Sequence, residues 1–256
     1  MMPCPRVCNF ILCVFFLTIA APAQQTADYH FEKGNEYYLA EDYERAVQEY
    51  ETVLRNELES AELYYNLGNS YYKLGHLGRA ILNYERAQKL KPKDRNIAFN
   101  LRLANLQVRD RIEKPPEFLF FRWNRALVTA LSLRLWAWLL GLLFFLGSLL
   151  FALRQLLTQR RLCRLCRQGQ RLFFILALVA LLFLVQRYDM SYRQHYGIIT
   201  KSSVKCLAAP QEGSTELFMV HEGTKVQLLD QDGDWRKIEL IDGKQGWLPT
   251  ITLETI

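Results

Sequence analysis

The 256-residue chain has little of what marks several common protein classes. Its 13 Gly and 8 Pro exclude a collagen-like chain, and its 6 Cys exclude a disulfide-dense miniature fold. The 4 histidines are dispersed and form no recognisable motif with Cys or Ser, and the sequence has neither a phosphate-binding loop nor a dinucleotide fingerprint. We therefore expect no catalytic residues, no cofactor and no enzymatic activity. A hydrophobic content of 50% excludes a disordered chain as well.

Two clusters have some features of metal sites. One is a run of alternating aspartates: Asp230, Asp232 and Asp234. An EF-hand calcium loop needs Gly at its sixth position and Glu at its twelfth, whereas here Gly233 is fourth and Ile241 is twelfth. The other cluster, Cys163 and Cys166, has the spacing of a redox pair or half a zinc site but lacks a second ligand pair. We expect a hairpin tip at the aspartates and no metal at either place.

The net charge of +6 at first suggests a nucleic-acid partner. However, residues 154–171 contain six arginines and no acid, and the rest of the chain has 26 basic and 26 acidic residues. These arginines lie between two apolar runs, so we interpret them as topology determinants rather than a nucleic-acid surface. They are Arg154, Arg160, Arg161, Arg164, Arg167 and Arg171.

The two apolar runs predict a transmembrane hairpin. Residues 135–153 contain no charge and reach about 28 Å as a helix, which is enough for a bilayer core. Residues 172–186 are shorter, and we interpret them as the return span. Arg-rich short loops stay in the cytoplasm, so both soluble parts are expected outside it. Three arginines before the first span run against this bias: Arg122, Arg125 and Arg134.

The first 23 residues resemble a secretory signal peptide. An apolar stretch over residues 10–20 is followed by Ala21-Pro22-Ala23, which is typical of a cleavage site. Such a signal places the following residues outside the cytoplasm, in agreement with the arginine argument. An uncleaved anchor is the alternative.

Residues 27–94 repeat with a period of 34, the length of a tetratricopeptide repeat (TPR). Gly34 recurs as Gly68, and Tyr50 recurs as Tyr84. The second copy also has the small Ala80 and the closing Pro that the TPR pattern requires. Residues 94–112 continue at helical spacing and are expected to cap the repeats.

The repeats place a stripe of Tyr and Asn side chains on one face. In the TPR family, asparagines at such positions often hold the backbone of an extended peptide. The basic clamp of the carboxylate-binding subgroup is absent, because Phe31, Asn96 and Asn100 occupy its positions. The alternative is that the tyrosines only pack and the asparagines only face solvent. The candidate groove residues are Phe31, Asn35, Tyr38, Tyr65, Asn66, Asn69, Tyr72 and Asn100.

From residue 197 the pattern changes to short β-prone runs separated by turns such as Asp232-Gly233 and Asp242-Gly243. The motifs HEGTKV, GDW and DGKQGW resemble a bacterial SH3 domain, which implies a small closed β-barrel. Trp235 and Trp247 are expected in its core. The resemblance does not imply Pro-rich ligands, since no acidic and aromatic ligand motif is present. Bacterial relatives often bind cell-wall peptides or pack against a neighbouring domain.

The fold class is therefore multidomain: an all-α TPR solenoid, a two-helix transmembrane hairpin and an all-β SH3-like small barrel. The expected order is a signal peptide (1–23), a TPR domain (24–116, with repeats 27–60 and 61–94 and a capping helix 94–112), an interfacial linker (117–134), transmembrane helix 1 (135–153), a cytoplasmic Arg-rich loop (154–171), transmembrane helix 2 (172–186), a linker (187–196) and an SH3-like domain (197–256).

This order of domains resembles the BatE-like TPR–SH3 proteins of the Bat (aerotolerance) operon family. The resemblance implies a bacterial inner-membrane scaffold with both soluble domains in the periplasm. It implies partners of the von Willebrand A and MoxR ATPase types and a role in envelope integrity or oxidative stress. The alternative is a cell-wall sensor whose SH3-like domain binds peptidoglycan. In either case membrane lipid is a partner and nucleic acid is not.

Overall fold

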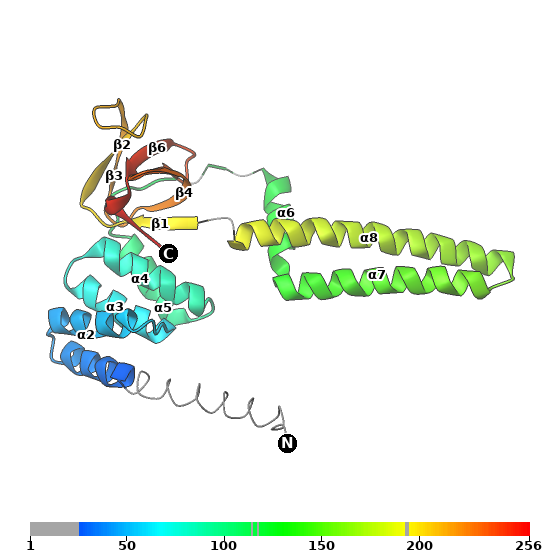
Figure 1. Cartoon of the computed structure of the whole chain (residues 1–256), viewed down its shortest axis with the longest axis horizontal. Coiled ribbons are helices and arrows are strands. Elements are labelled where there is room, and N and C mark those ends of the chain that lie inside the picture. The colour runs from blue at the N-terminus through cyan, green and yellow to red at the C-terminus, as the bar shows by residue number, and fades with distance from the viewer. Residues whose placement is uncertain (1–25, 114, 117, 193–194) are drawn as a thin grey trace, which may run out of the picture. The chain divides into compact units, whose positions relative to one another are not determined.

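The computed structural model describes residues 26–113, 115–116, 118–192 and 195–256. The predicted signal peptide lies outside these residues. The chain forms two compact units: unit 1 combines the residues up to Glu113 with Tyr196–Ile256, and unit 2 comprises Lys114–His195. Unit 1 thus consists of two sequence segments separated by unit 2 (Figure 1).

The N-terminal part of unit 1 is a stack of antiparallel helices. Three of the helices begin at a side-chain cap, in which Asp42, Ser60 or Asp94 accepts a backbone N–H of the first turn. Helix α4 instead has His76 at its N-cap, and the His76 side chain makes no capping hydrogen bond. The helices are residues 26–39, α2 (Tyr43–Arg55), α3 (Ala61–Lys73), α4 (Leu77–Leu90) and α5 (Arg95–Asn105).

The period of 34 residues has a direct packing reason. A Cβ on Gly34 would lie 2.5 Å from the Tyr50 ring, and a Cβ on Gly68 would lie 2.8 Å from the Tyr84 ring. Each tyrosine is 1% exposed and fills the space that the glycine leaves. Both repeats are therefore built on the same contact between a glycine and a tyrosine.

The C-terminal part of unit 1 is an antiparallel sheet in the order β3-β2-β6-β5-β4-β1-β7. Among the described residues β3 and β7 form its two edges, so the sheet is not closed and the expected SH3-like barrel is not shown. The strands are β1 (His195–Ile199), β2 (Ser203–Leu207), β3 (Glu216–His221), β4 (Lys225–Asp232), β5 (Trp235–Glu239), β6 (Gln245–Pro249) and β7 (Leu253–Thr255).

The two tryptophans expected in the core are only half-buried. Side chains alternate between the faces of a strand, and Gly246 and Leu248 are buried, so Trp247 lies on the opposite face. Trp235 is three positions from the buried Ile238 and also lies on that outer face. Cys206 belongs to the core, where burial raises the pKa of its thiol to about 12.

The helical and sheet parts of unit 1 share apolar contacts. Ile198 of β1 belongs to the buried cluster of the helices, and Ile112 packs against the cluster of the sheet. At Gly78, a Cβ would lie 2.5 Å from the carbonyl oxygen of Ile199. Glycine at this position therefore lets the first turn of α4 lie directly on the backbone of β1.

Polar contacts between the two parts surround this apolar core. The Asp110 carboxylate, just after α5, accepts the backbone N–H of His221 (2.6 Å) and the Thr224 hydroxyl (2.7 Å), and it contacts His221 Nδ1 (2.6 Å). Glu222 Oε1 accepts the Gly78 N–H at 2.8 Å. Glu222 thus supplies from the sheet the cap that His76 does not provide for α4.

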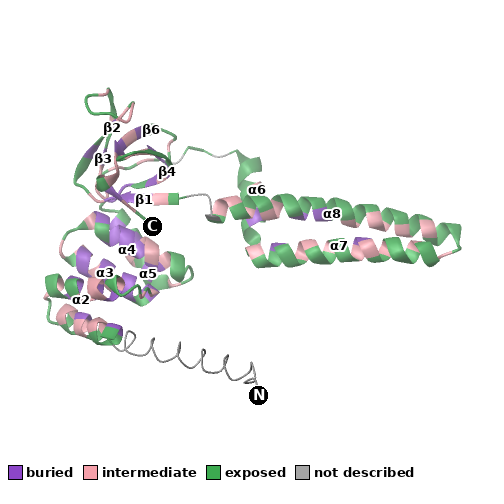
Figure 2. Ribbon diagram, viewed as in Figure 1, coloured by how far each residue is buried: buried purple, intermediate pink, exposed green. Residues whose placement is uncertain are grey.

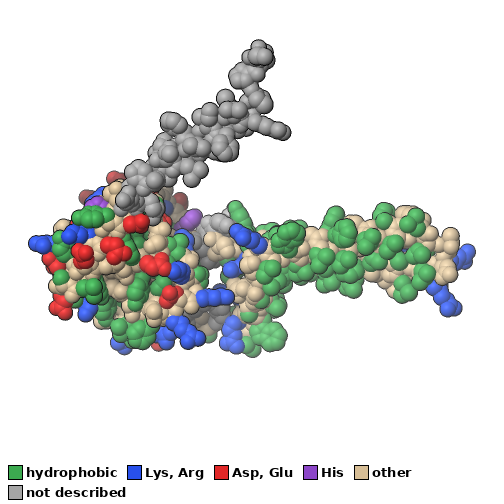
Figure 3. Space-filling model, turned by 90° about the horizontal axis from the view of Figure 1, so that it is seen from below, with side chains coloured by type: hydrophobic (Ala, Val, Ile, Leu, Met, Phe, Trp, Pro, Cys, Tyr) green, Lys and Arg blue, Asp and Glu red, His purple; other side chains and the backbone are tan. Residues whose placement is uncertain are grey.

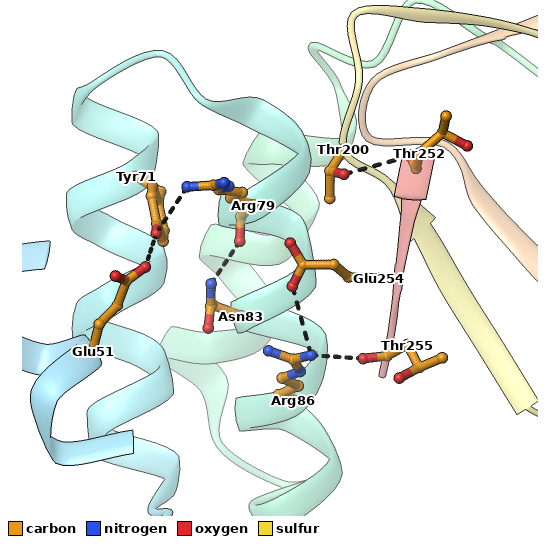
Figure 4. A network of polar contacts seen from close by, with 9 residues as sticks. All are labelled: Glu51, Tyr71, Arg79, Asn83, Arg86, Thr200, Thr252, Glu254 and Thr255. Carbon is orange, nitrogen blue, oxygen red and sulfur yellow. Dashed lines mark hydrogen bonds and ion pairs between the residues drawn. The ribbon is translucent and has the colours of Figure 1, made fainter. Parts of the chain in front are cut away.

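A second group of polar contacts lies further along α4 (Figure 4). Arg86 donates to the carbonyl oxygen of Thr255 at 2.8 Å and lies 3.9 Å from the Glu254 carboxylate. Lys225 donates to Glu85 at 2.7 Å. Because these pairs and the Asp110 contacts lie at different points of the interface, we treat unit 1 as one folded body.

Unit 2 is helical and consists of α6 (Leu119–Ala130), α7 (Leu133–Leu156) and α8 (Arg160–Tyr192). Only 157–159 connect α7 to α8, and most of the segment expected as a loop continues in α8. The Arg, Leu and Gln residues of that segment are good helix formers, which explains the extension.

Within the described residues, α7 and Arg160–Ser191 are long and apolar enough to cross a membrane by length and composition. Only 11% of the apolar window of each helix is buried, whereas the core helix of a soluble protein is mostly buried. Figure 2 shows the exposed surface along both helices, and Figure 3 shows its hydrophobic character, with basic side chains at the tip.

Candidate functional site

The asparagines predicted to line a groove form hydrogen bonds that repeat from one unit to the next. Asn35 Oδ1 accepts from the Tyr50 hydroxyl (2.8 Å) and from Asn66 Nδ2 (3.0 Å). One repeat later, Asn69 Oδ1 accepts from the Tyr84 hydroxyl (2.8 Å) and from Asn100 Nδ2 (2.9 Å). These bonds fix the orientation of each amide relative to its neighbours.

Burial keeps the tyrosines of this network in their donor form. Desolvation raises the pKa of both Tyr50 and Tyr84 above its ordinary value, so both hydroxyls stay protonated near neutral pH. Asn69 Nδ2 and Asn100 Oδ1 have no hydrogen-bond partner among the described residues. Asn69 of the second repeat and Asn100 of the capping helix α5 therefore present one unused donor and one unused acceptor, the pair that a peptide group requires.

A pocket of about 170 Å³ lies beside these amide groups. Four of the predicted groove residues line it together, from the first helix, α3 and α5. Three further lining residues were not predicted, because Lys73 and Leu103 lie outside the repeated stripe and Tyr84 was assigned to packing. The lining residues are Tyr38, Asn69, Tyr72, Lys73, Tyr84, Asn100 and Leu103.

The other predicted groove residues support the pocket or lie away from it. Phe31 packs on the Tyr50 ring with centroids 5.9 Å apart, as a partly buried packing residue. Tyr65 accepts from Asn100 Nδ2 at 3.0 Å and so helps to orient that amide. Asn35 and Asn66 belong to the first copy of the network and do not line this pocket.

Comparison with known proteins supports the helical part. Residues 31–95 match the family model described as "Tetratricopeptide repeat". Among solved structures the chain is similar to one titled "Crystal structure of YrrB: a TPR protein with an unusual peptide-binding site", with 27% identity and a TM-score of 0.30. That similarity covers 38% of this chain and 54% of the other, so the chain spans about half of its length. No curated protein matches.

The matched residues contain most of the first copy of the period, the whole second copy and the first residues of the capping region, so the family match is limited to this segment. Stacked TPR units expose extended surfaces that bind other proteins. Repeats that match this model typically serve as protein-interaction modules, which is the class that the matched segment suggests.

Proposed function

We propose that this protein is a two-pass membrane scaffold whose TPR pocket binds an extended segment of a partner protein. The observation that carries the proposal is the pocket itself, in which the unused amide groups of Asn69 and Asn100 lie beside the rings of Tyr38 and Tyr72. Fixed amides can pair with a peptide backbone, and the aromatic rings can cover its side chains. Lys73 adds a positive charge at the same place, which favours a segment that carries an acidic residue.

The arrangement of unit 1 supports the two-pass topology. The chain leaves this folded body after Glu113 and returns to it at Tyr196. Both ends of the intervening segment must then lie on the same side of any membrane, which requires an even number of crossings. Two helices of sufficient length lie between them, and the arginines of residues 154–171, at the end of α7 and the start of α8, favour the cytoplasmic side for their connection.

Labelling with a membrane-impermeant maleimide tests this topology. A cysteine at Leu39 and one at Glu212, on the two segments of unit 1, should react from the same outer side of intact cells. A cysteine at Gln159 should react only after the membrane is permeabilised. Reaction of Gln159→Cys in intact cells, or of Leu39→Cys and Glu212→Cys from opposite sides, would contradict the topology. Cys163 and Cys166 are replaced by Ala in all three variants.

Peptide selection tests the pocket. Phage-displayed peptides selected on the full chain in nanodiscs should lose at least about tenfold in affinity, measured by fluorescence anisotropy, when Leu103→Glu is introduced. Leu103 is 41% exposed, so a charge is tolerated there but blocks the pocket. Leu39→Glu is the matched control, since Leu39 is 83% exposed and does not line the pocket. Equal binding by both variants, or no selected peptide, would exclude this site.

From the proposed topology and the resemblance to the Bat operon proteins, we infer that the protein lies in a bacterial inner membrane with both interaction surfaces in the periplasm. The partners would be von Willebrand A-type membrane proteins and, through the Arg-rich segment, a MoxR-type ATPase, in a complex for envelope or oxidative-stress tolerance. Copurification of such a membrane protein with the full chain, and its loss on Leu103→Glu, tests this assignment.

A second candidate function is peptidoglycan binding by the sheet, which we propose to be an SH3-like barrel. The observation that favours it is the position of Trp235 and Trp247, which lie half-buried on the outer face rather than in the core. Retention of the full chain on purified sacculi, lost on Trp247→Ala and unchanged by Leu103→Glu, would support this function over the scaffold.

A further inference from the structure

Helix α6 has one face that packs within unit 2. The indole Nε1 of Trp136 donates to the carbonyl oxygen of Val128 at 3.1 Å, and Val128 is 1% exposed. Asn124 Nδ2, one turn earlier on the same face, donates to Gln186 Oε1 at 3.2 Å. Since these contacts join α6 to both long helices, α6 is held in a defined position rather than acting as a loose linker.

These contacts also locate α6 along the hairpin. Trp136 lies near the start of α7, and Gln186 lies near the end of α8. The rings of Trp136 and Phe183 are 5.2 Å apart, so the two long helices meet here as well. Helix α6 therefore lies at the end of the hairpin where the chain enters and leaves, opposite residues 157–159, which connect α7 to α8 (Figure 1).

The remaining surface of α6 is amphipathic. Leu119, Trp123 and Leu127 follow each other at helical spacing and are 65%, 70% and 54% exposed. Phe120, one residue after Leu119, extends this apolar surface at 76% exposure. An exposed aromatic surface of this kind, beside two exposed apolar helices, is unusual in a soluble unit.

The polar side chains of α6 lie on a different arc. At 100° per residue, Arg122, Arg125 and Thr129 fall within about 60° of each other and away from Trp123. Arg122 is exposed. The helix thus has a packed face, an exposed apolar face and a basic face.

We propose that α6 lies in the plane of the membrane interface, with its Trp123 face in the acyl-chain boundary and Arg122 at the headgroup phosphates of phospholipids. This proposal rests on the proposed two-pass topology, which puts this end of the hairpin at the boundary between lipid and water. Amphipathic rings favour that boundary, and a long basic side chain can reach the phosphates while its stem stays in apolar surroundings.

The assignment accounts for the arginines that precede the first span. On the positive-inside argument alone, Arg122 and Arg125 oppose an external position for this segment. On an interfacial helix Arg122 instead lies at the headgroup phosphates, where a basic side chain is favourable on either side of the membrane. Lipid is the partner because the apolar face is continuous with the two helices that cross the bilayer.

Fluorescence quenching in liposomes tests the proposal. The full chain is reconstituted into phosphatidylcholine and phosphatidylglycerol vesicles, with a single NBD-labelled cysteine at Trp123, Thr129 or Leu142. Cys206 remains, because its side chain is fully buried and inaccessible to the label. The other cysteines are replaced by Ala: Cys4, Cys8, Cys13, Cys163 and Cys166.

The label at Trp123→Cys should lose fluorescence with a lipid that carries a shallow spin label and keep it with aqueous iodide. The label at Thr129→Cys, the matched position on the basic face, should lose more with iodide. The label at Leu142→Cys, within α7, should respond to a deep spin label. Phe120→Cys serves as a second apolar position and should behave like Trp123→Cys.

The outcomes separate this proposal from the proposed function. If Leu142→Cys responds to the deep spin label while Trp123→Cys and Phe120→Cys respond to iodide, the hairpin stands and the interfacial position is wrong. If both apolar positions are shielded from iodide and from the shallow spin label, the interfacial proposal is also wrong, because protein then covers this face of α6. If Leu142→Cys does not respond to lipid, both proposals fail.

Discussion

Replacing Asp110 with Ala should lower the free energy of unfolding of unit 1 by about 2–4 kcal/mol. The Asp110 carboxylate holds three groups of the sheet, and its side chain is 15% exposed. Alanine would leave the backbone N–H of His221 and the 4% exposed Thr224 hydroxyl without their acceptor. Pulse proteolysis of the detergent-solubilised chain across a urea series measures the change.

The same contact predicts a dependence on pH. Burial raises the pKa of Asp110, but hydrogen bonds from Thr224 and His221 outweigh it and hold the pKa below its ordinary value. The contribution of Asp110 is therefore complete above the unfolded-state pKa of about 3.9 and is lost as pH falls through the lower folded-state pKa. In the Asp110→Ala variant, the free energy of unfolding should depend less on pH in this acidic range. Glu212→Gln removes an exposed charge as a control, and an equal loss in that variant would refute the role of Asp110.

Gly78→Ala should destabilise unit 1 by about 1–2 kcal/mol, although alanine favours a helix by about 1 kcal/mol over glycine. The reason is the contact between α4 and β1, where a Cβ would lie 2.5 Å from the carbonyl oxygen of Ile199 and 2.8 Å from Glu222 Cγ. A backbone atom cannot move aside as a flexible side chain can. Helix α4 and strand β1 must therefore move apart, and this movement also weakens the cap that Glu222 provides for α4.

The test is whether Gly78→Ala lowers or raises the free energy of unfolding of unit 1, measured again by pulse proteolysis in urea. Gly141→Ala in α7 is the control, because a Cβ there would meet nothing within 4 Å. It should leave the unfolding of unit 1 unchanged. A Gly78→Ala variant as stable as the native chain would mean that α4 and β1 do not pack as closely as described.

The repeat structure could be predicted from the sequence because its causes are local. Gly34 and Gly68 recur at the positions where Tyr50 and Tyr84 need space, and the period makes this visible without a structure. The repetition of Asn35 as Asn69, and of Asn66 as Asn100, is visible in the same way, although only Asn69 and Asn100 line the pocket. Lys73 and Leu103 could not, since each occurs once and only the packing of α3 beside α5 brings them to the pocket.

The union of the helical and sheet parts was not predictable from either part alone. Glu222 is an ordinary turn residue in the sequence, and His76 is only a weak cap. Only the folded structure shows that Glu222 takes over the capping of α4, because it accepts the N–H of Gly78, which lies 144 positions earlier in the sequence. The sequence analysis expects Trp247 in the core, but strand alternation places its smaller neighbours Gly246 and Leu248 inside and Trp247 on the outer face.

The division of unit 1 into two segments orders its biosynthesis. The chain is made from its N-terminus, so the TPR helices are complete before the hairpin and the sheet exist. During that interval the α4 N-terminus has no Glu222, and the surface that will receive Ile198 is uncovered. In the proposed topology, a chain with only one helix inserted would hold the two segments on opposite sides of the membrane. Completion of unit 1 would then occur only in chains with both helices inserted.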